Sequence, residues 1–121
     1  MRKEHAEMIK MLEISDEQWA SVNEKNRKIV EEFLRESIQL STESIKQYSS
    51  ALKIFFYWIK ENAENKMFYD IKPRDYLLYQ NFLSRQGLSS SAIRMKRSAI
   101  SSLNGYIEVY YSDEYPMFRN F

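Results

Sequence analysis

Apolar residues recur at intervals of three, four and seven in the stretch 88–111, which is the spacing of one face of an α-helix. The stripe consists of Ile93, Ile100, Leu103, Ile107 and Tyr110. Gly87 ends the preceding element, and Ser89 or Ser90 can accept hydrogen bonds from the free N–H groups of a first helical turn. We therefore predict a helix from Ser90 to Tyr111 that buries this stripe.

A second helix is predicted from Thr42 to Glu61, with Ser41 or Thr42 as its N-cap. Its apolar face is wide, and Trp58 flanks it. The residues of this face are Ile45, Tyr48, Leu52, Phe55, Phe56 and Ile59. Because burying each large apolar side chain stabilises a fold by roughly 1.5–3 kcal/mol, we expect this helix to form the centre of the core.

The preceding region predicts another helix, from about Asp16 to Ser37, with Ser15 or Asp16 at its N-cap. Its apolar face consists of Trp19, Val22, Ile29, Val30 and Phe33. Asn26 interrupts this stripe, so we expect imperfect packing at that point. The other face carries charges of both signs, which indicates a solvated surface with a structural role.

Shorter segments complete the helical pattern. Residues 1–13 predict a short amphipathic helix, whose apolar residues are Met8, Ile9, Met11 and Leu12. Residues 61–72 are polar and turn-like, and the apolar residues among them that we expect to fold back on the core are Met67, Phe68 and Ile71. Pro73 fits the first turn of a helix that runs to about Gln86. The inward residues of that helix are predicted to be Tyr76, Tyr79, Phe82 and Leu83.

The composition supports an all-α fold. The 121 residues suit one domain, and two Gly and two Pro favour long helices over the frequent turns of sandwiches and barrels. There is no Cys, and His5 is the single histidine, so we predict no disulfide framework, no metal site and no cofactor. The longest apolar run, Ile54 to Ile59, is too short to cross a bilayer, and the N-terminus lacks the apolar core of a signal peptide.

Charge is segregated along the chain, although the net charge is +1. Residues 1–43 hold seven basic and ten acidic residues. Residues 44–60 contain three lysines and no acid, and residues 76–107 contain four basic residues and no acid. Such segregation is typical of an electrostatic footprint for nucleic acid in a near-neutral domain. An ordinary solvated helix face is the alternative explanation.

Most basic residues of the acid-free segments fall opposite the apolar stripes, among hydroxyl groups that can approach phosphates. On the helix that begins at Thr42 this face holds Thr42, Lys46, Ser50, Lys53, Tyr57 and Lys60. On the helix that begins at Ser90 it holds Arg94, Arg97, Ser98 and Ser101, with Ser89, Ser90 and Ser91 at its start. Lys96 lies instead among the apolar positions, where its stem can snorkel. We expect these two faces to contact duplex DNA, with Arg94 as the candidate for a base contact.

Two sequence patterns resemble a known family. The first is Leu40-Ser41-Thr42-x-x-Ile45-x-x-Tyr48-x-x-x-Leu52-x-x-Phe55-x-x-Trp58-Ile59. The second is Leu83-x-x-x-Gly87-Leu88-Ser89-x-Ser91-Ala92-Ile93-x-x-x-x-Ser98-Ala99-Ile100. In order and spacing they are similar to the core-binding domain of tyrosine recombinases, also called the SAM-like N-terminal domain of phage integrases. The terminal Tyr115-Pro116-x-Phe118-x-Asn120 lies where that family joins its catalytic domain, so the resemblance covers about residues 23–121.

The resemblance implies an orthogonal four-helix bundle, here with a short extra N-terminal helix, that clamps one face of duplex DNA while a catalytic domain clamps the other. In the family, the helices that start here at Thr42 and Ser90 lie against the DNA, in agreement with the charge argument. Relatives often carry an apolar residue where this chain has Arg97, so an orientation of Arg97 toward the core is the alternative to exposure. The implied partners are double-stranded DNA, the protein's own catalytic domain and neighbouring recombinase protomers. The implied setting is a bacterial or phage-encoded cytoplasmic protein without a membrane association.

The family's reaction attaches a tyrosine to a DNA 3′-phosphate with the help of arginines, a lysine and histidines. That apparatus is not recognisable in this sequence, which has no His-x-x-Arg pattern. We therefore predict a non-catalytic integrase fragment with an N-terminal extension (1–15), a helical domain (16–112) and the start of a linker to an absent catalytic domain (113–121). One alternative is a helical protein-interaction module that does not bind DNA, which the acidic first helix favours. A stand-alone enzyme is the other, and the lack of a clustered acid, base or metal set argues against it.

Overall fold

The computed structural model describes residues 13–37 and 39–120, and all regular structure within them is helical. The elements are α2 (Asp16–Ala20), α3 (Glu24–Glu36), α4 (Thr42–Asn62), a 3-10 turn η1 (Phe68–Asp70), α5 (Pro73–Arg85) and α6 (Ser90–Tyr110). The predicted all-α class is confirmed. The helix predicted for residues 1–13, apart from Glu13, lies outside the described residues, as does His5.

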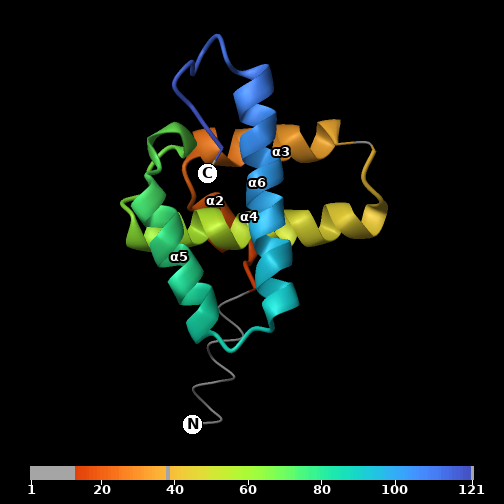
Figure 1. The fold of residues 1–121 in the computed structure, drawn as a ribbon, viewed down its shortest axis with the longest axis vertical. Helices are drawn as coiled ribbons and strands as arrows, with labels where there is room; N and C mark the ends of the chain where they lie inside the picture. Colours follow the sequence, from red (N-terminus) through yellow and green to blue (C-terminus); the bar gives the residue numbers. More distant parts are fainter. Residues whose placement is uncertain (1–12, 38, 121) are drawn as a thin grey trace.

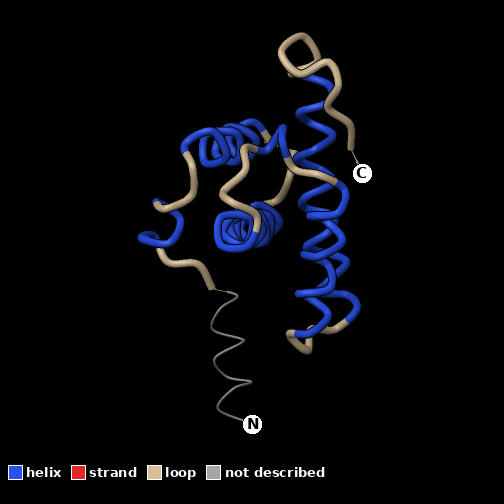
Figure 2. Tube along the Cα trace, turned by 90° about the vertical axis from the view of Figure 1, so that its left-hand side faces the viewer, coloured by secondary structure: helices blue, strands red, loops and turns tan. Residues whose placement is uncertain are grey.

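Helix α4 lies in the middle of the fold. In Figure 1, α3 and α4 run alongside each other and α6 runs across both of them. Figure 2 shows α4 almost end-on, with α2 on one side of it and α6 on the other. The two sides of α4 therefore differ: one packs against the long helix α6, and the other faces the short helix α2.

The core is centred on α4, as predicted from its wide apolar face. The residues of this face that are at most 2% exposed are Leu52, Phe55, Phe56 and Ile59. The ring of Phe55 stacks on Tyr76 of α5 at a centroid distance of 5.5 Å and meets Tyr79 edge-on at 4.9 Å. Helix α6 contributes the buried residues Ala99, Ile100, Leu103 and Ile107. Aromatic side chains fill much of this core, since offset and edge-to-face ring pairs stabilise it beyond their buried area.

Side chains at the helix starts explain the boundaries of the two long helices. The Oγ atoms of Ser41 and Ser89 each accept a hydrogen bond of 3.1 Å from the N–H three residues later, which confirms these two predicted N-caps. Gly87 adopts a φ of 75°, in the left-handed region that favours glycine. The chain can therefore leave α5 and enter α6 within a few residues.

The single helix predicted for residues 16–37 is wrong, because the chain breaks between α2 and α3. Asn23 causes the break. Its Oδ1 accepts a hydrogen bond of 2.8 Å from the N–H of Asn26, as the N-cap of α3, and its Nδ2 donates to the carbonyl of Asn65 at 2.9 Å. A side chain that bonds nearby and distant backbone in this way competes with continuation of the helix.

The imperfect packing predicted at Asn26 is also wrong. This side chain is fully buried within the otherwise apolar face of α3. Its Oδ1 accepts a hydrogen bond of 2.6 Å from the N–H of Phe68, and its Nδ2 donates to the carbonyl of Lys66 at 2.8 Å. Asn26 therefore ties α3 to the segment that leads into η1, and it satisfies two backbone groups that would otherwise lack these partners.

Tyr110 is 72% exposed, so its predicted place in the buried stripe of α6 is wrong. Tyr106, one turn earlier, lies against α3 instead, where its ring meets Phe33 edge-on at 5.4 Å. The ring of Tyr110 contacts Tyr106 at 5.2 Å, beyond the part of α6 that α3 covers. The stripe also missed Asn104, a buried residue whose Nδ2 donates to the hydroxyl of Tyr76 at 3.2 Å.

Candidate nucleic-acid interface

The lysine face of α4 is partly covered. Thr42, Lys46 and Ser50 are exposed, whereas Lys53, Tyr57 and Lys60 are half-buried. The Nζ atom of Lys53 lies 5.8 Å from the ring centroid of Trp19, and that of Lys60 lies 5.5 Å from the ring of Tyr57. Cation–π contacts of this kind hold an ammonium group in place without neutralising its charge. Two of the three lysines are thus positioned by aromatic rings.

Lys60 also has an acidic neighbour. Its Nζ atom lies 2.9 Å from the carboxylate of Glu61, and this hydrogen bond raises the pKa of Lys60. Exposed ion pairs are weak, yet the carboxylate reduces the positive potential at that end of α4. The electrostatic contribution of Lys60 to the face is smaller than the acid-free count of residues 44–60 indicates.

Three of the candidate residues of α4 come together in one hollow. Lys46, Ser50 and Lys53 line an open depression of about 460 Å³, together with Glu13 and Ile14. Because Lys53 lies over Trp19 of α2, this part of the face is turned toward the side of α4 that is away from α6 (Figure 2). The hollow can accept an anionic group, although Glu13 supplies one negative charge at its edge.

The arginine face of α6 is open at its N-terminal half. The exposed candidate residues there are Ser89, Ser90, Ser91, Arg94, Arg97 and Ser98. Arg97 is exposed, so it does not turn toward the core. Within residues 13–37 and 39–120, no ion pair involves Arg94 or Arg97. Both guanidinium groups therefore present an unopposed charge to solvent, next to small hydroxyl side chains.

Lys96 lies where the sequence placed it, among the apolar positions of α6. It is half-buried, and this burial lowers the pKa of its ammonium group. Since a buried charge is disfavoured, Lys96 is a poorer candidate for a phosphate contact than the two arginines that flank it in the sequence.

Ser101 is exposed but already has a partner from the end of the chain. The Nδ2 atom of Asn120 donates to the carbonyl oxygen and to the Oγ of Ser101, each at 3.2 Å. Ser101, the last candidate residue of the predicted α6 face, therefore lies beside residues that follow the helix. Helical periodicity does not predict this contact, for which the aromatic residues Tyr115 and Phe118 were the available signal.

The candidate residues thus form two faces, which the structure does not unite into one surface. The apolar stripes of α4 and α6 pack toward each other, so their polar sides point away from each other. Lys53 of α4 lies over Trp19 of α2, whereas Arg94 and Arg97 belong to α6, which lies on the opposite side of α4 from α2 (Figure 2). Arg94 and Arg97 form the more accessible and less compensated of the two charge clusters.

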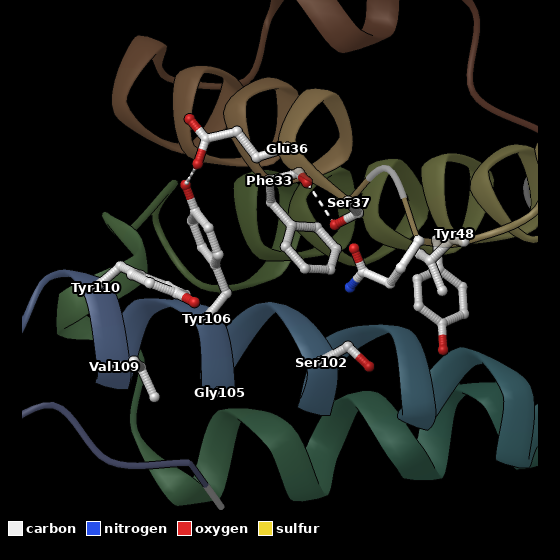
Figure 3. A pocket seen from close by; sticks show the side chains of 11 residues that line it. Phe33, Glu36, Ser37, Tyr48, Ser102, Gly105, Tyr106, Val109 and Tyr110 are labelled. Atoms are coloured by element: carbon white, nitrogen blue, oxygen red, sulfur yellow. Dashed lines mark hydrogen bonds between the residues drawn. The ribbon is translucent and has the colours of Figure 1, made fainter.

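A groove that the sequence did not predict lies between α3, the start of α4 and α6 (Figure 3). Its volume is about 540 Å³, and its apolar and aromatic lining consists of Phe33, Leu40, Tyr48, Tyr106, Val109 and Tyr110. Val109 and Tyr110 are 64% and 72% exposed, and Glu36 is the single charged residue of the lining. The hydroxyl of Tyr106 donates to the carboxylates of Glu32 (2.7 Å) and Glu36 (2.8 Å).

The tyrosines at this end of α6 are bonded to carboxylates. Burial and hydrogen bonds to Glu32 and Glu36 raise the pKa of Tyr106. The hydroxyl of Tyr111 also donates to Glu32, and this bond raises the pKa of Tyr111 to about 12. Raised pKa values disfavour the phenolate, which is the opposite of what an activated nucleophile needs. The described residues also hold no cluster of three or more His, Cys, Asp or Glu side chains that could bind a metal ion, and none of their helices is long and apolar enough to span a membrane.

Two comparisons identify what the chain is similar to. Residues 30–107 match the family described as phage integrase, N-terminal SAM-like domain. The chain is 40% identical over 116 residues to the SPbeta prophage-derived recombinase-like protein YomM of Bacillus subtilis (strain 168). The aligned stretch covers 93% of this chain and 34% of the relative. The chain thus spans about a third of the length of this curated relative. No solved structure matches it.

Proposed function

Because this chain belongs to the family of phage integrase N-terminal SAM-like domains, we propose that it is a core-binding domain that holds one face of duplex DNA during recombination. The observation that carries this proposal is the exposure of Arg94 and Arg97 on a helix face without an acidic partner. Guanidinium groups bind phosphate oxygens with paired hydrogen bonds, and small serines beside them allow a close approach of the backbone. The hollow that contains Lys46 and Lys53 lies on the other charged face and is a separate candidate for phosphate contacts.

In this proposal the chain contributes binding and no chemistry. A tyrosine with an ordinary pKa of about 10 needs clustered cationic donors to attack a phosphodiester. Tyr106 and Tyr111 instead face carboxylates, and burial raises the pKa of Tyr76 to about 12. The catalytic residues of the complete recombinase would come from the protein's own catalytic domain, and neighbouring protomers would complete the complex on DNA.

Salt-dependent binding tests the DNA-binding role. We expect the chain to bind a mixed-sequence duplex weakly, with log K falling by about 0.9 per phosphate contact for each unit of log salt concentration. Arg94→Ala and Arg97→Ala should each make this slope shallower by about one unit. Arg35→Ala, which removes an exposed arginine from α3, is the matched control and should leave the slope unchanged. Equal slopes for all four proteins would contradict the proposal.

A suicide duplex tests the absence of chemistry. A nicked duplex that traps a 3′-phosphotyrosine should give no covalent adduct with this chain. Adduct formation that one Tyr→Phe substitution abolishes would contradict the non-catalytic role.

The alternative function, a helical module that binds protein and not DNA, is favoured by one observation. The groove in Figure 3 has exposed apolar residues on its wall, and surface patches of this kind mark interaction sites in many proteins. The salt titration separates the two functions. A DNA-binding domain should lose affinity for the duplex with Arg94→Ala and keep it with Arg35→Ala, whereas a protein-binding module should show no difference between the two variants.

A further inference from the structure

The groove between α3, the start of α4 and α6 lies outside the two charged faces. Among the described residues, none of the arginines or lysines lines it. Phe33 lines it as a buried residue, whereas Val109 and Tyr110 of α6 line it while 64% and 72% exposed (Figure 3). A single exposed apolar residue needs no explanation, but two beside a hollow of about 540 Å³ indicate a surface on which an apolar partner can be buried.

The groove carries negative charge on its α3 side. The Tyr106 hydroxyl lies 2.7 Å from a carboxylate oxygen of Glu32 and 2.8 Å from one of Glu36, and the Tyr111 hydroxyl also bonds Glu32. A phenol carries one proton, so Tyr106 can donate to one of the two carboxylates at a time. In the part of the chain that the structure describes, neither carboxylate forms an ion pair. The groove therefore complements a segment that is apolar and carries a cation.

A segment with this pattern precedes the described residues. Lys10 is the one charged residue of the stretch 8–12, and its neighbours there are apolar, namely Met8, Ile9, Met11 and Leu12. Methionine side chains are unbranched and flexible, so they fit irregular apolar surfaces such as the wall of this groove. DNA binding gives this amphipathic stretch no role. It supplies both the apolar side chains and the cation that the groove complements.

The stretch joins the domain on a different side of α4 from the groove. Glu13 lines the hollow that contains Lys46, whereas the groove contains Tyr48. Lys46 and Tyr48 are two residues apart on α4, so about 200° of helical rotation separates them. Lys10 precedes Glu13 by three residues, which span at most about 11 Å of extended chain. The apolar stretch therefore meets the groove of a second copy more readily than the groove of its own chain.

We propose that this groove binds residues 1–12 of a second copy of the chain, with Lys10 paired to Glu36. The apolar residues of the bound segment then pack on Val109 and Tyr110. This inference does not depend on DNA binding, because it uses none of the charged residues of the two candidate faces. The segment and the groove are different surfaces, so the contact is head-to-tail. A short segment buries little area, so the association is weak and depends on protein concentration.

Sedimentation velocity of the full chain over a range of concentrations tests this contact. The weight-average sedimentation coefficient should rise with concentration. Lys10→Glu and Glu36→Lys should each weaken the association about tenfold or more, because each variant places like charges opposite each other. The double variant exchanges the two charges, so its association should return to within about threefold of that of the unaltered chain. A structural role of either residue within its own chain predicts no such recovery.

Tyr110→Ser tests the apolar part of the contact without touching the hydrogen bonds of Glu36. Because Tyr110 is 72% exposed, its replacement should preserve the fold, which circular dichroism checks, and should weaken the association. Arg85→Glu reverses a charge at the exposed end of α5, away from the lining of the groove, and is the matched control. It should leave the association unchanged.

A chain that stays monomeric at every concentration would overturn this inference, and amide shifts around Val109 in the Lys10→Glu variant of such a monomer would place the segment on its own chain instead. Association that Lys10→Glu and Tyr110→Ser leave intact would also overturn it. Losses in the single variants without recovery in the double variant would overturn the pairing of Lys10 with Glu36. The duplex titration with Arg94→Ala is a separate measurement, so the proposed function and this inference can fail independently.

Discussion

Replacement of Asn26 by alanine should destabilise the fold, even though it removes only one small polar side chain. The amide of Asn26 satisfies the Phe68 N–H and the Lys66 carbonyl at 2.6 and 2.8 Å. Leaving a buried backbone group without its partner costs about 1–3 kcal/mol. The Lys66 carbonyl keeps a second donor, the Nδ2 of Asn23 at 3.3 Å, so Asn26→Ala should lose about 1–3 kcal/mol, chiefly from the unpaired Phe68 N–H. A loss of this size matters against the about 5–15 kcal/mol that stabilises a typical domain.

Urea unfolding followed by far-ultraviolet circular dichroism measures this loss. The midpoint should fall while the slope stays the same, since the surface exposed on unfolding hardly changes. Asn81→Ala, at an exposed position of α5, is the matched control and should stay within about 0.5 kcal/mol of the unaltered chain.

A second variant distinguishes hydrogen bonding from simple packing. Asn26→Leu restores an uninterrupted apolar stripe on α3 but still leaves the Phe68 N–H without its partner and the Lys66 carbonyl with the Asn23 donor alone. It should be about as unstable as Asn26→Ala. If Asn26→Leu were as stable as the unaltered chain, or if Asn26→Ala cost less than about 1 kcal/mol, the role of this side chain as a bridge between α3 and the η1 segment would be refuted.

Two further predictions concern charged groups that the fold holds. Partial burial alone would raise the pKa of Asp75, but hydrogen bonds from the Lys72 N–H and the Lys66 ammonium outweigh it and hold the pKa below its usual value. The stability that the Asp75 carboxylate contributes is fully present above its ordinary pKa near 4 and is lost as the pH falls through the lower pKa of the folded state. Asp75→Asn should therefore cost about 1–3 kcal/mol at neutral pH. Its melting temperature should also fall less on acidification than that of the unaltered chain. Burial lowers the pKa of Lys96, so the stability of the unaltered chain should rise as the pH climbs from the folded pKa to the unfolded value near 10.5. Lys96→Met should be more stable at pH 7 in urea unfolding and should lack that rise, and a lower stability of this variant would contradict the assignment.

Local pattern was sufficient to predict the two long helices. The stripes of α4 and α6, together with Ser41 and Ser89 as N-caps, depend on residues within a few positions of one another, and the sequence displays them directly. The break at Asn23 depends instead on Asn65, which lies 42 residues away. No local pattern reveals such a partner. For the same reason Asn26, whose partners are the backbone groups of Lys66 and Phe68, was interpreted from the sequence as a packing defect.

The candidate interface shows the same division. Exposure of Arg94 and Arg97 follows from helical periodicity, and the structure places both in solvent. The partner of Ser101 does not follow from periodicity, because Asn120 reaches it only when Tyr115 and Phe118 pack on Phe68. Residues 113–121 were interpreted from the sequence as the start of a linker, and only the folded domain shows that Tyr115, Phe118 and Asn120 pack against it.

The most direct test of the DNA-binding account is an amide shift map of the ¹⁵N-labelled chain during titration with a mixed-sequence duplex at low salt. We predict the largest shifts at residues 89–101, further shifts at residues 46–53, and none beyond background in α3, which serves as the internal control. Shifts confined to residues 16–37, or to the groove between α3 and α6, would contradict the account and favour the protein-interaction module in its place.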